Sequence, residues 1–142
     1  MDVGRTSLWD TKTMGALRSE TAIAISAIES ALDLSRARVG ASDVTLKGER
    51  DIVTATDVLI EDRIRELLGE SLGATVVGEE RGGEIGSGSY WLVDPICGTR
   101  NFASGIPLYC INLALVENGR VTVSAVGDAS TVAVLVAQYG SG

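Results

Sequence analysis

Apolar side chains return at helical spacing along the first part of the chain. Between residues 13 and 38, apolar or small side chains recur every three or four positions, with charged side chains between them. This spacing places them on one face of a helix. We therefore predict a long amphipathic helix that ends at Gly40 and the segment 41–43. Its buried stripe would consist of Leu17, Thr21, Ala24, Ile28 and Leu32.

The same spacing predicts a second helix that begins near residue 56. Thr56 or Asp57 would cap its first turn, because either side chain can accept a hydrogen bond from a free backbone N–H group. The helix would end within the segment 69–73, which begins and ends with glycine. Its apolar stripe would consist of Ile60, Ile64, Leu67 and Leu68, and its solvent-facing charges of Glu61, Asp62, Arg63, Arg65 and Glu66.

From residue 74 onward the pattern changes to short apolar runs bounded by glycine, proline and polar residues, which is typical of strands. Strands are predicted over residues 74–77, 90–93, 110–116, 121–126 and 132–138, with a loop over 81–89. The second strand should stop at Asp94 and Pro95, and the run 110–116 should be buried on both faces. Asn118 and Gly119 predict a type I′ turn. Two helices followed by a largely antiparallel sheet form an α+β fold.

The composition limits the class of protein. The 142 residues suffice for one domain, and 45% of them are hydrophobic, as in ordinary globular proteins. The formal net charge is −7. A chain this acidic lacks the positive charge that binds nucleic-acid phosphates or anionic membrane surfaces. We therefore expect neither a nucleic-acid nor a membrane partner.

Histidine is absent and cysteine is rare, and both facts limit the chemistry. Without histidine the chain cannot form Ser-His-Asp or Cys-His catalytic sites or a histidine-ligated zinc site. Catalysis would depend on carboxylates, hydroxyls, backbone amides, Lys or Arg, or on a metal ion held by oxygen. Cys97 and Cys110 are expected to be reduced thiols. The sequence starts without an export signal, so we expect a cytoplasmic protein.

Acidic residues follow two of the predicted strands. Glu79 and Glu80 come after the run that ends at Val77, and Asp94 comes after the run 90–93. If the two strands are parallel neighbours, Glu79 and Asp94 meet at one edge of the sheet. Such carboxylates repel each other unless a hard cation such as Mg²⁺ lies between them. The alternative is that they are ordinary acids in solvated loops, as most Asp and Glu residues are.

The segment 94–102 adds a feature of phosphate-binding sites. Pro95 and Gly98 indicate a turn, and Thr99 stands at the start of a short helix. Consecutive backbone amides at Gly98 and Thr99 would form a corner that binds anions. A carboxylate metal site beside such a corner is the outline of a site for phosphate esters. The alternative is an ordinary glycine turn.

These segments together resemble a known enzyme family. Gly78-Glu79-Glu80, followed by Asp94-Pro95-Ile96-x-Gly98-Thr99-x-Asn101-Phe102, looks like the two signature segments of the inositol monophosphatase family of metal-dependent, lithium-sensitive phosphatases. Lys47 and the segment 51–57 are similar to the part of the family that opens its second helix. The resemblance runs from about residue 13 to 142. It implies a single domain, 1–142, that corresponds to the first half of the layered α/β/α/β/α fold, with the family's C-terminal half absent.

The resemblance implies a Mg²⁺ site and a role for each of its residues. Glu79 and Asp94 would hold the first Mg²⁺ together with the backbone carbonyl of Ile96. Glu80 would lie close by and act through water or a third ion. Metal and amides would neutralise charge on the phosphoryl group, which is the main requirement of phosphoryl transfer.

The resemblance also implies the catalytic and phosphate-binding residues. Thr99, paired with Asp57, would orient and deprotonate the water that attacks phosphorus. The amides of Gly98 and Thr99 would bind the phosphate oxygens. The substrate would be a small phosphorylated polyol or sugar, and inositol phosphate, a sugar bisphosphate and a phosphoadenosine nucleotide all stay open.

The chain departs from the family at Cys97, where the family has an Asp that also binds a second metal ion. A thiol is a poor ligand for Mg²⁺. Another ligand of that second ion belongs to the family's C-terminal half. Three readings follow: a fragment or truncated phosphatase; a one-metal phosphatase in which Arg100 replaces the charge of the second ion; or a non-catalytic homologue that serves as a binding or dimerisation module.

The missing half also has a physical consequence. One face or edge of the sheet formed by residues 110–126 and 132–138 should lack its usual cover. We therefore expect self-association, most simply as a dimer.

Overall fold

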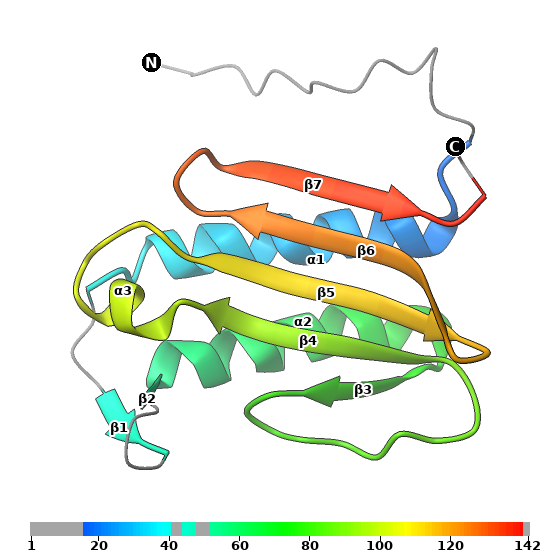
Figure 1. The fold of residues 1–142 in the computed structure, drawn as a ribbon, viewed down its shortest axis with the longest axis horizontal. Helices are drawn as coiled ribbons and strands as arrows, with labels where there is room; N and C mark the ends of the chain where they lie inside the picture. Colours follow the sequence, from blue (N-terminus) through cyan, green and yellow to red (C-terminus); the bar gives the residue numbers. More distant parts are fainter. Residues whose placement is uncertain (1–15, 41–43, 48–51, 141–142) are drawn as a thin grey trace.

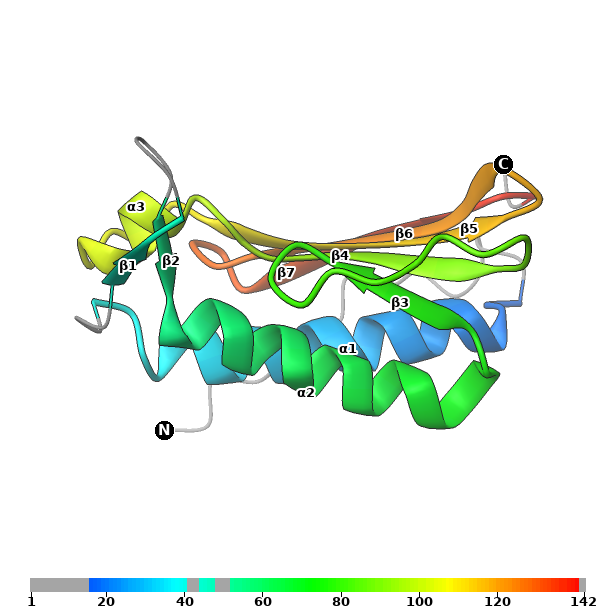
Figure 2. The same cartoon turned by 90° about the horizontal axis from the view of Figure 1, so that it is seen from below.

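Two long helices pack side by side on one face of a sheet (Figures 1 and 2). The computed structural model describes residues 16–40, 44–47 and 52–140. The helices are α1 (Ser19–Arg36) and α2 (Ala55–Leu72), and a short α3 (Thr99–Ala103) follows the second strand of the main sheet. The main sheet comprises β3 (Thr75–Gly78), β4 (Tyr90–Cys97), β5 (Cys110–Glu117), β6 (Arg120–Asp128) and β7 (Ala133–Gln138). The predicted α+β class is confirmed.

The strands of the main sheet lie in chain order, β3-β4-β5-β6-β7. β3 is parallel to β4, and each later strand is antiparallel to the one before it. The parallel pair is the arrangement that brings residues after β3 and residues near the end of β4 to the same place. A separate antiparallel pair, β1 (Val44–Leu46) and β2 (Ile52–Thr54), was not predicted, because three residues are too few to show a strand period.

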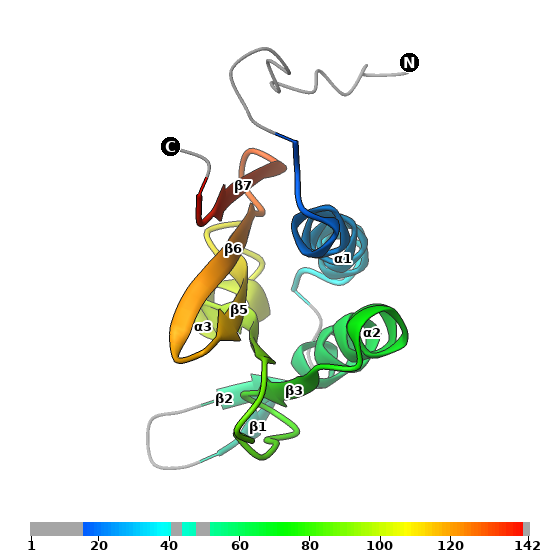
Figure 3. The same ribbon diagram turned by 90° about the vertical axis from the view of Figure 1, so that its right-hand side faces the viewer.

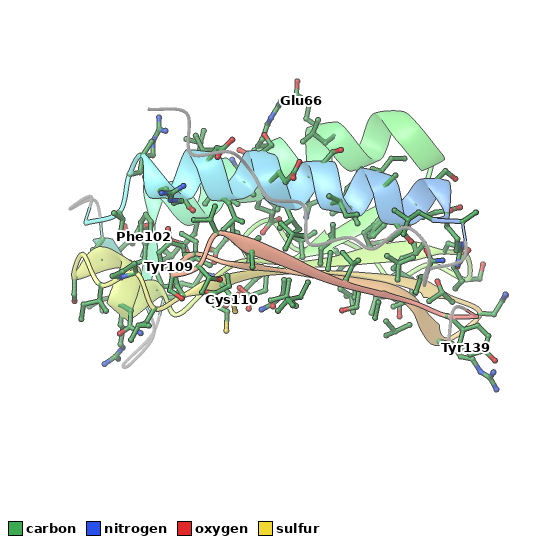
Figure 4. All side chains as sticks on the ribbon, turned by 90° about the horizontal axis from the view of Figure 1, so that it is seen from above. Glu66, Phe102, Tyr109, Cys110 and Tyr139 are labelled. Carbon is green, nitrogen blue, oxygen red and sulfur yellow. The ribbon has the colours of Figure 1, made fainter. Side chains whose placement is uncertain are left out.

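The core lies between the two helices and the sheet. From α1 it includes Ala24, Ala27, Ile28, Ala31 and Leu32; from α2, Ile60, Ile64 and Leu68; and from the sheet, Trp91, Ile111, Leu113, Leu115, Val123 and Ala125. Helix α1 lies so close to β6 that a Cβ atom on Gly127 would come within 2.6 Å of Ile28 Cγ2. Figure 4 shows Phe102 and Tyr109 next to each other at the α3 end of this core, where their rings meet edge to face at 5.2 Å.

The helix predictions are confirmed in their spacing and need correction at their starts. Residues 16–18 are not helical, and Leu17 is 46% exposed, whereas the rest of its predicted stripe is buried. Helix α2 begins at Ala55 because Thr54 caps it, forming a capping box with Asp57. The expected caps, Thr56 and Asp57, were therefore wrong by two or three positions. The helix ends at Gly73, whose φ of 60° is left-handed, within the predicted segment.

Two strand predictions were wrong. β4 does not stop at Asp94 and Pro95 but continues to Cys97, with a shift of register between Asp94 and Cys97. A bulge of this kind lets a proline stay within a strand. β5 is not buried on both faces: its burial alternates, because helices cover only one face of the sheet. The predicted turn at Asn118 and Gly119 is confirmed by their φ values of 50° and 73°.

The other face of the main sheet has no helix or strand on it in the described part of the chain (Figure 3). We call this surface the open face. Leu92 and Leu135 on this face are 37% and 62% exposed. Cys110 also points away from the helices (Figure 4). The apolar surface that the sequence led us to expect is therefore present, whereas self-association stays a prediction.

Candidate active site

The first turn of α2 holds Asp57 in a buried and fixed position. Asp57 is 1% exposed, and its Oδ2 accepts hydrogen bonds from the backbone N–H of Thr54, at 2.8 Å, and from the Thr54 hydroxyl. In return, the backbone N–H of Asp57 donates to Thr54 Oγ1 over 3.3 Å. The capping box leaves Oδ1 of Asp57 available for a partner outside the helix.

That partner is Thr99, the first residue of α3. Thr99 Oγ1 lies 3.1 Å from Asp57 Oδ1 and 3.0 Å from the backbone oxygen of Ile96. The preceding Gly98 has a φ of 109°, and a Cβ atom there would come within 3.1 Å of the Leu108 backbone oxygen. Glycine at position 98 is thus required for the turn that brings Thr99 to Asp57.

Glu79 and Asp94 come together because β3 and β4 are parallel. Gly78 is the register partner of Val93, and the backbone N–H of Glu79 donates to the Val93 oxygen over 3.1 Å. Partial burial, hydrogen bonding with Asp94 and the negative charge of Asp94 together raise the pKa of Glu79 to about 7. The predicted convergence of the two carboxylates is present.

The donor set between these carboxylates fits a hard divalent cation. Asp94 Oδ1 is buried and has no hydrogen-bond partner among the described residues, and Oδ2 accepts a long contact of 3.5 Å from Asn112 Nδ2. A buried carboxylate oxygen beside a second carboxylate needs a cation or a proton. Within the described residues no three His, Cys, Asp or Glu side chains are grouped to hold a metal ion. A cation at this position would therefore take further ligands from the backbone, where Ile96 is near, or from water.

A hollow of about 320 Å³ opens over these groups, and we call it the site hollow. Its lining residues are Glu79, Asp94, Ile96, Cys97, Gly98, Thr99, Arg100 and Asn101. A second hollow, of about 400 Å³, lies on the open face and shares Glu79 and Asp94 with the site hollow. Glu79 and Asp94 thus lie between the site hollow and the hollow on the open face.

Glu80 lies next to this site but does not line the hollow. Its carboxylate, 5% exposed, pairs with Lys47 Nζ at 2.6 Å. Burial raises the pKa of Glu80, the pairing with Lys47 lowers it, and the negative charges of Asp57 and Glu61 raise it. The charge of Asp57 thus acts on Glu80. The expected part of Glu80 in catalysis stays a prediction.

Cys97 and Arg100 both line the hollow and are exposed. Cys97 is the register partner of Cys110 across β4 and β5, and both thiols are free. Partial desolvation of the thiol, the negative charge of Asp94 and the neighbouring Cys110 raise the pKa of Cys97 to about 11. The thiol is therefore protonated at neutral pH, and a protonated thiol is a weak ligand for Mg²⁺.

The prediction that Glu61 faces solvent was wrong. Its side chain is fully buried beneath the Gly78–Arg81 turn and accepts hydrogen bonds from the backbone N–H groups of Glu80 and Arg81. One signal in the sequence could have indicated this: Asp57, Glu61 and Arg65 are spaced four residues apart and so share one side of α2.

Comparison with known proteins identifies the family. A model of the inositol monophosphatase family matches residues 11–142. The histidinol-phosphatase of Mycobacterium tuberculosis is 37% identical over 108 residues, which are 73% of this chain and 42% of that protein. The fructose-1,6-bisphosphatase/inositol-1-monophosphatase of Aquifex aeolicus is 38% identical over 92 residues, 63% of this chain and 34% of that one.

Solved structures agree with this result. The IMPase of Thermotoga maritima superposes with a TM-score of 0.82 at 31% identity, over 88% of this chain and 50% of that one. The extragenic suppressor protein suhB of Bartonella henselae gives 0.83 at 27% identity, over 88% and 51%. The chain thus spans about half the length of these structures.

None of the described helices has the length and apolar character needed to cross a bilayer.

One assignment follows from the family match over residues 11–142. The fold, the convergence of Glu79 with Asp94 and the Thr99–Asp57 contact agree with it. This chain belongs to the inositol monophosphatase family.

Proposed function

We propose that this chain carries the metal-binding and water-activating part of a Mg²⁺-dependent phosphomonoesterase. The observation that carries the proposal is the Thr99–Asp57 contact of 3.1 Å at the site hollow, whose wall also includes Glu79 and Asp94. The substrate would be a small phosphorylated polyol or sugar. Family membership favours this function over the alternative of a non-catalytic binding module.

Asp57 and Thr99 would handle the proton of the attacking water. The buried Asp57 carboxylate attracts the proton of the Thr99 hydroxyl, so a lone pair of Thr99 Oγ1 can accept a hydrogen bond from water in the site hollow. Proton transfer from that water along the pair makes the water a better nucleophile toward phosphorus. The capping box keeps Asp57 from rotating out of this contact.

Glu79, Asp94 and the carbonyl of Ile96 would hold the Mg²⁺ ion. When bound, the ion supplies positive charge that polarises a phosphate ester. The unpartnered Oδ1 of Asp94 and the raised pKa of Glu79 are the features that support this ligand set. Burial and the nearby charge of Asp94 raise the pKa of Glu79 more than the charge of Lys47 lowers it, so a further cation would stabilise the pair.

The backbone amides of Gly98 and Thr99 would bind the phosphate oxygens. Both residues line the site hollow, and the absence of a side chain at position 98 lets the backbone lie close to a ligand. The protonated thiol of Cys97 would not hold the second metal ion that the family's Asp binds at this position. Arg100, in the same wall, would supply the positive charge of that missing ion.

We also propose that a second copy of this 142-residue chain covers the open face. Leu92 and Leu135 leave apolar surface there, and β3 and β7 are the edges of the described sheet. A cytoplasmic location and a single domain over 1–142 both stay predictions.

Phosphate release from a small panel of phosphomonoesters, with and without Mg²⁺, tests the function. The panel contains an inositol phosphate, a sugar bisphosphate and a phosphoadenosine nucleotide, and Cys97→Asp is measured beside the unchanged chain. Mg²⁺-dependent release by the unchanged chain supports one-metal catalysis. Release only after Cys97→Asp supports the loss of a metal ligand. No release by either chain, together with no binding of Mg²⁺, contradicts the proposal.

A further inference from the structure

We propose that Glu61 is a positioning residue, whose buried carboxylate fixes the turn that carries Glu79 and so sets the affinity of the site for its divalent cation. The inference rests on the proposed function for the role of Glu79. The turn in question is Gly78–Arg81, between β3 and the loop that follows it. None of the roles assigned above to metal, water or phosphate uses Glu61.

The carboxylate of Glu61 accepts four hydrogen bonds from backbone and Arg65 donors. Oε2 accepts from the backbone N–H of Glu80 at 2.6 Å, and Oε1 accepts from the backbone N–H of Arg81 at 3.0 Å. Oε1 also accepts from Nε and Nη2 of Arg65, at 2.9 and 2.8 Å. With its oxygens used in this way, Glu61 holds the backbone and is not itself placed as a metal ligand.

Three successive backbone amides of the turn are held by hydrogen bonds, two of them by Glu61. The N–H of Glu79 donates to Val93 in β4, and the next two N–H groups donate to Glu61 in α2. The backbone on both sides of the Glu79 side chain is tied to two different elements. The point from which the Glu79 side chain leaves the backbone is therefore fixed, and from there Glu79 lines the site hollow together with Asp94.

Arg65 closes the turn from its other side. Its Nη1 donates to the Val76 oxygen at 2.9 Å, and its Nη2 also donates to the Gly82 oxygen. Arg65 thus connects β3 before the turn with the loop after it, and it supplies the positive charge that the buried Glu61 needs.

Gly78 provides the space in which this carboxylate lies. A Cβ atom at position 78 would come within 2.1 Å of Glu61 Oε1 and within 2.2 Å of Glu61 Cδ. The carboxylate can reach the amides of residues 80 and 81 only because residue 78 has no side chain. A buried charge is unfavourable unless it is paired and hydrogen-bonded. Glu61, on α2, meets both conditions beside the turn that carries the proposed metal ligand Glu79.

The test compares Glu61→Gln with Glu66→Gln in the full 142-residue chain. Glu66 lies on the same helix and points away from the sheet (Figure 4). Its side chain is 59% exposed and pairs with Arg63. Two quantities are measured: Mg²⁺ affinity by calorimetry, and amide hydrogen exchange in the metal-free protein. Glu61→Gln places an amide, which donates hydrogen bonds, where the turn needs an acceptor.

We expect Glu61→Gln to weaken Mg²⁺ binding by roughly 10- to 100-fold, as loss of groups that orient metal ligands does elsewhere. Amide exchange should become faster at Glu80 and Arg81 and stay unchanged in β5. Glu66→Gln should change neither quantity. If Glu61→Gln does not fold, Glu61→Asp replaces it, because the shorter side chain keeps the charge but does not reach both amides.

Unchanged Mg²⁺ affinity in a folded Glu61 variant would overturn the inference, even with faster exchange, because Glu61 would then be only structural. Unchanged exchange at Glu80 and Arg81 would also overturn it. If the unsubstituted chain binds no Mg²⁺, the proposed function fails and so does the effect on cation affinity. The exchange rates would still decide whether Glu61 holds the turn.

Discussion

Thr99 Oγ1 lies 3.1 Å from Asp57 Oδ1, although the two residues are 42 positions apart in the chain. The contact joins α3, at the end of β4, to the first turn of α2. It places a hydroxyl between a buried carboxylate and the site hollow, and two predictions depend on it directly.

Asp57→Asn should abolish most of the activity. The amide keeps the size of the side chain but removes the negative charge that draws the proton of Thr99, so we expect phosphate release to fall by roughly 100-fold or more. Mg²⁺ affinity should stay within about twofold, because Asp57 is not among the proposed ligands. Steady-state kinetics and calorimetry measure both quantities. Asp33→Asn, on the exposed side of α1, is the control and should change neither.

Thr99→Val should lower activity to a similar extent, while Thr99→Ser should keep most of it. Valine has nearly the shape of threonine but no hydroxyl, whereas serine keeps the oxygen that contacts Asp57. Phosphate release at saturating Mg²⁺ distinguishes the two variants. Equal activity of the valine and serine variants would contradict a role for the hydroxyl.

The stability of the metal-free protein should fall as pH rises from about 4.5 to about 7. The pKa of Glu79 is about 7 in the folded chain and 4.5 as the ordinary value, so over this interval the folded state binds more protons than the unfolded state. Above that interval Glu79 is ionised in both the folded and the unfolded state, so its contribution to stability should no longer change with pH. Urea unfolding at several pH values measures this effect. Glu79→Gln should flatten the pH dependence, and a dependence that persists in that variant would have another source.

Gly78→Ala should destabilise the fold, by about 1–3 kcal/mol, because the added methyl group collides with the carboxylate of Glu61. Gly69→Ala is a matched control with the opposite sign. Gly69 lies within α2, and no described residue has an atom within 4 Å of an added Cβ, so alanine there should stabilise the helix by about 0.5–1 kcal/mol. Urea unfolding without Mg²⁺ measures both changes.

Leu135→Glu should weaken self-association. Leu135 is 62% exposed in β7, on the open face, and a charge there would oppose burial against a second copy. Leu59→Glu, on α2 and 40% exposed, is the control. Sedimentation velocity over a range of concentrations measures the association. A strictly monomeric, folded chain at high concentration would contradict the prediction itself.

Features that depend on neighbouring residues were determined by the sequence alone. The periodic stripe Ile60, Ile64, Leu67 and Leu68 predicted the buried side of α2. Leu67 is partly buried, and the other three side chains are fully buried. The turn at Asn118 and Gly119 could be predicted because its conformation depends on the preference of these two residues for positive φ. The order of Glu79, Asp94 and Thr99 in their motifs was likewise enough to propose a shared site.

Only the tertiary structure decided which polar residues are buried and which apolar ones are not. Glu61 has the sequence context of a surface residue, and its burial depends on a turn that begins 17 positions later and on the absence of a side chain at Gly78. The residues of β5 have the composition of a fully buried strand, yet one side stays open because both long helices lie on the same face of the sheet. Local preferences act within a few residues, whereas the burial of a side chain depends on which distant segments pack against it.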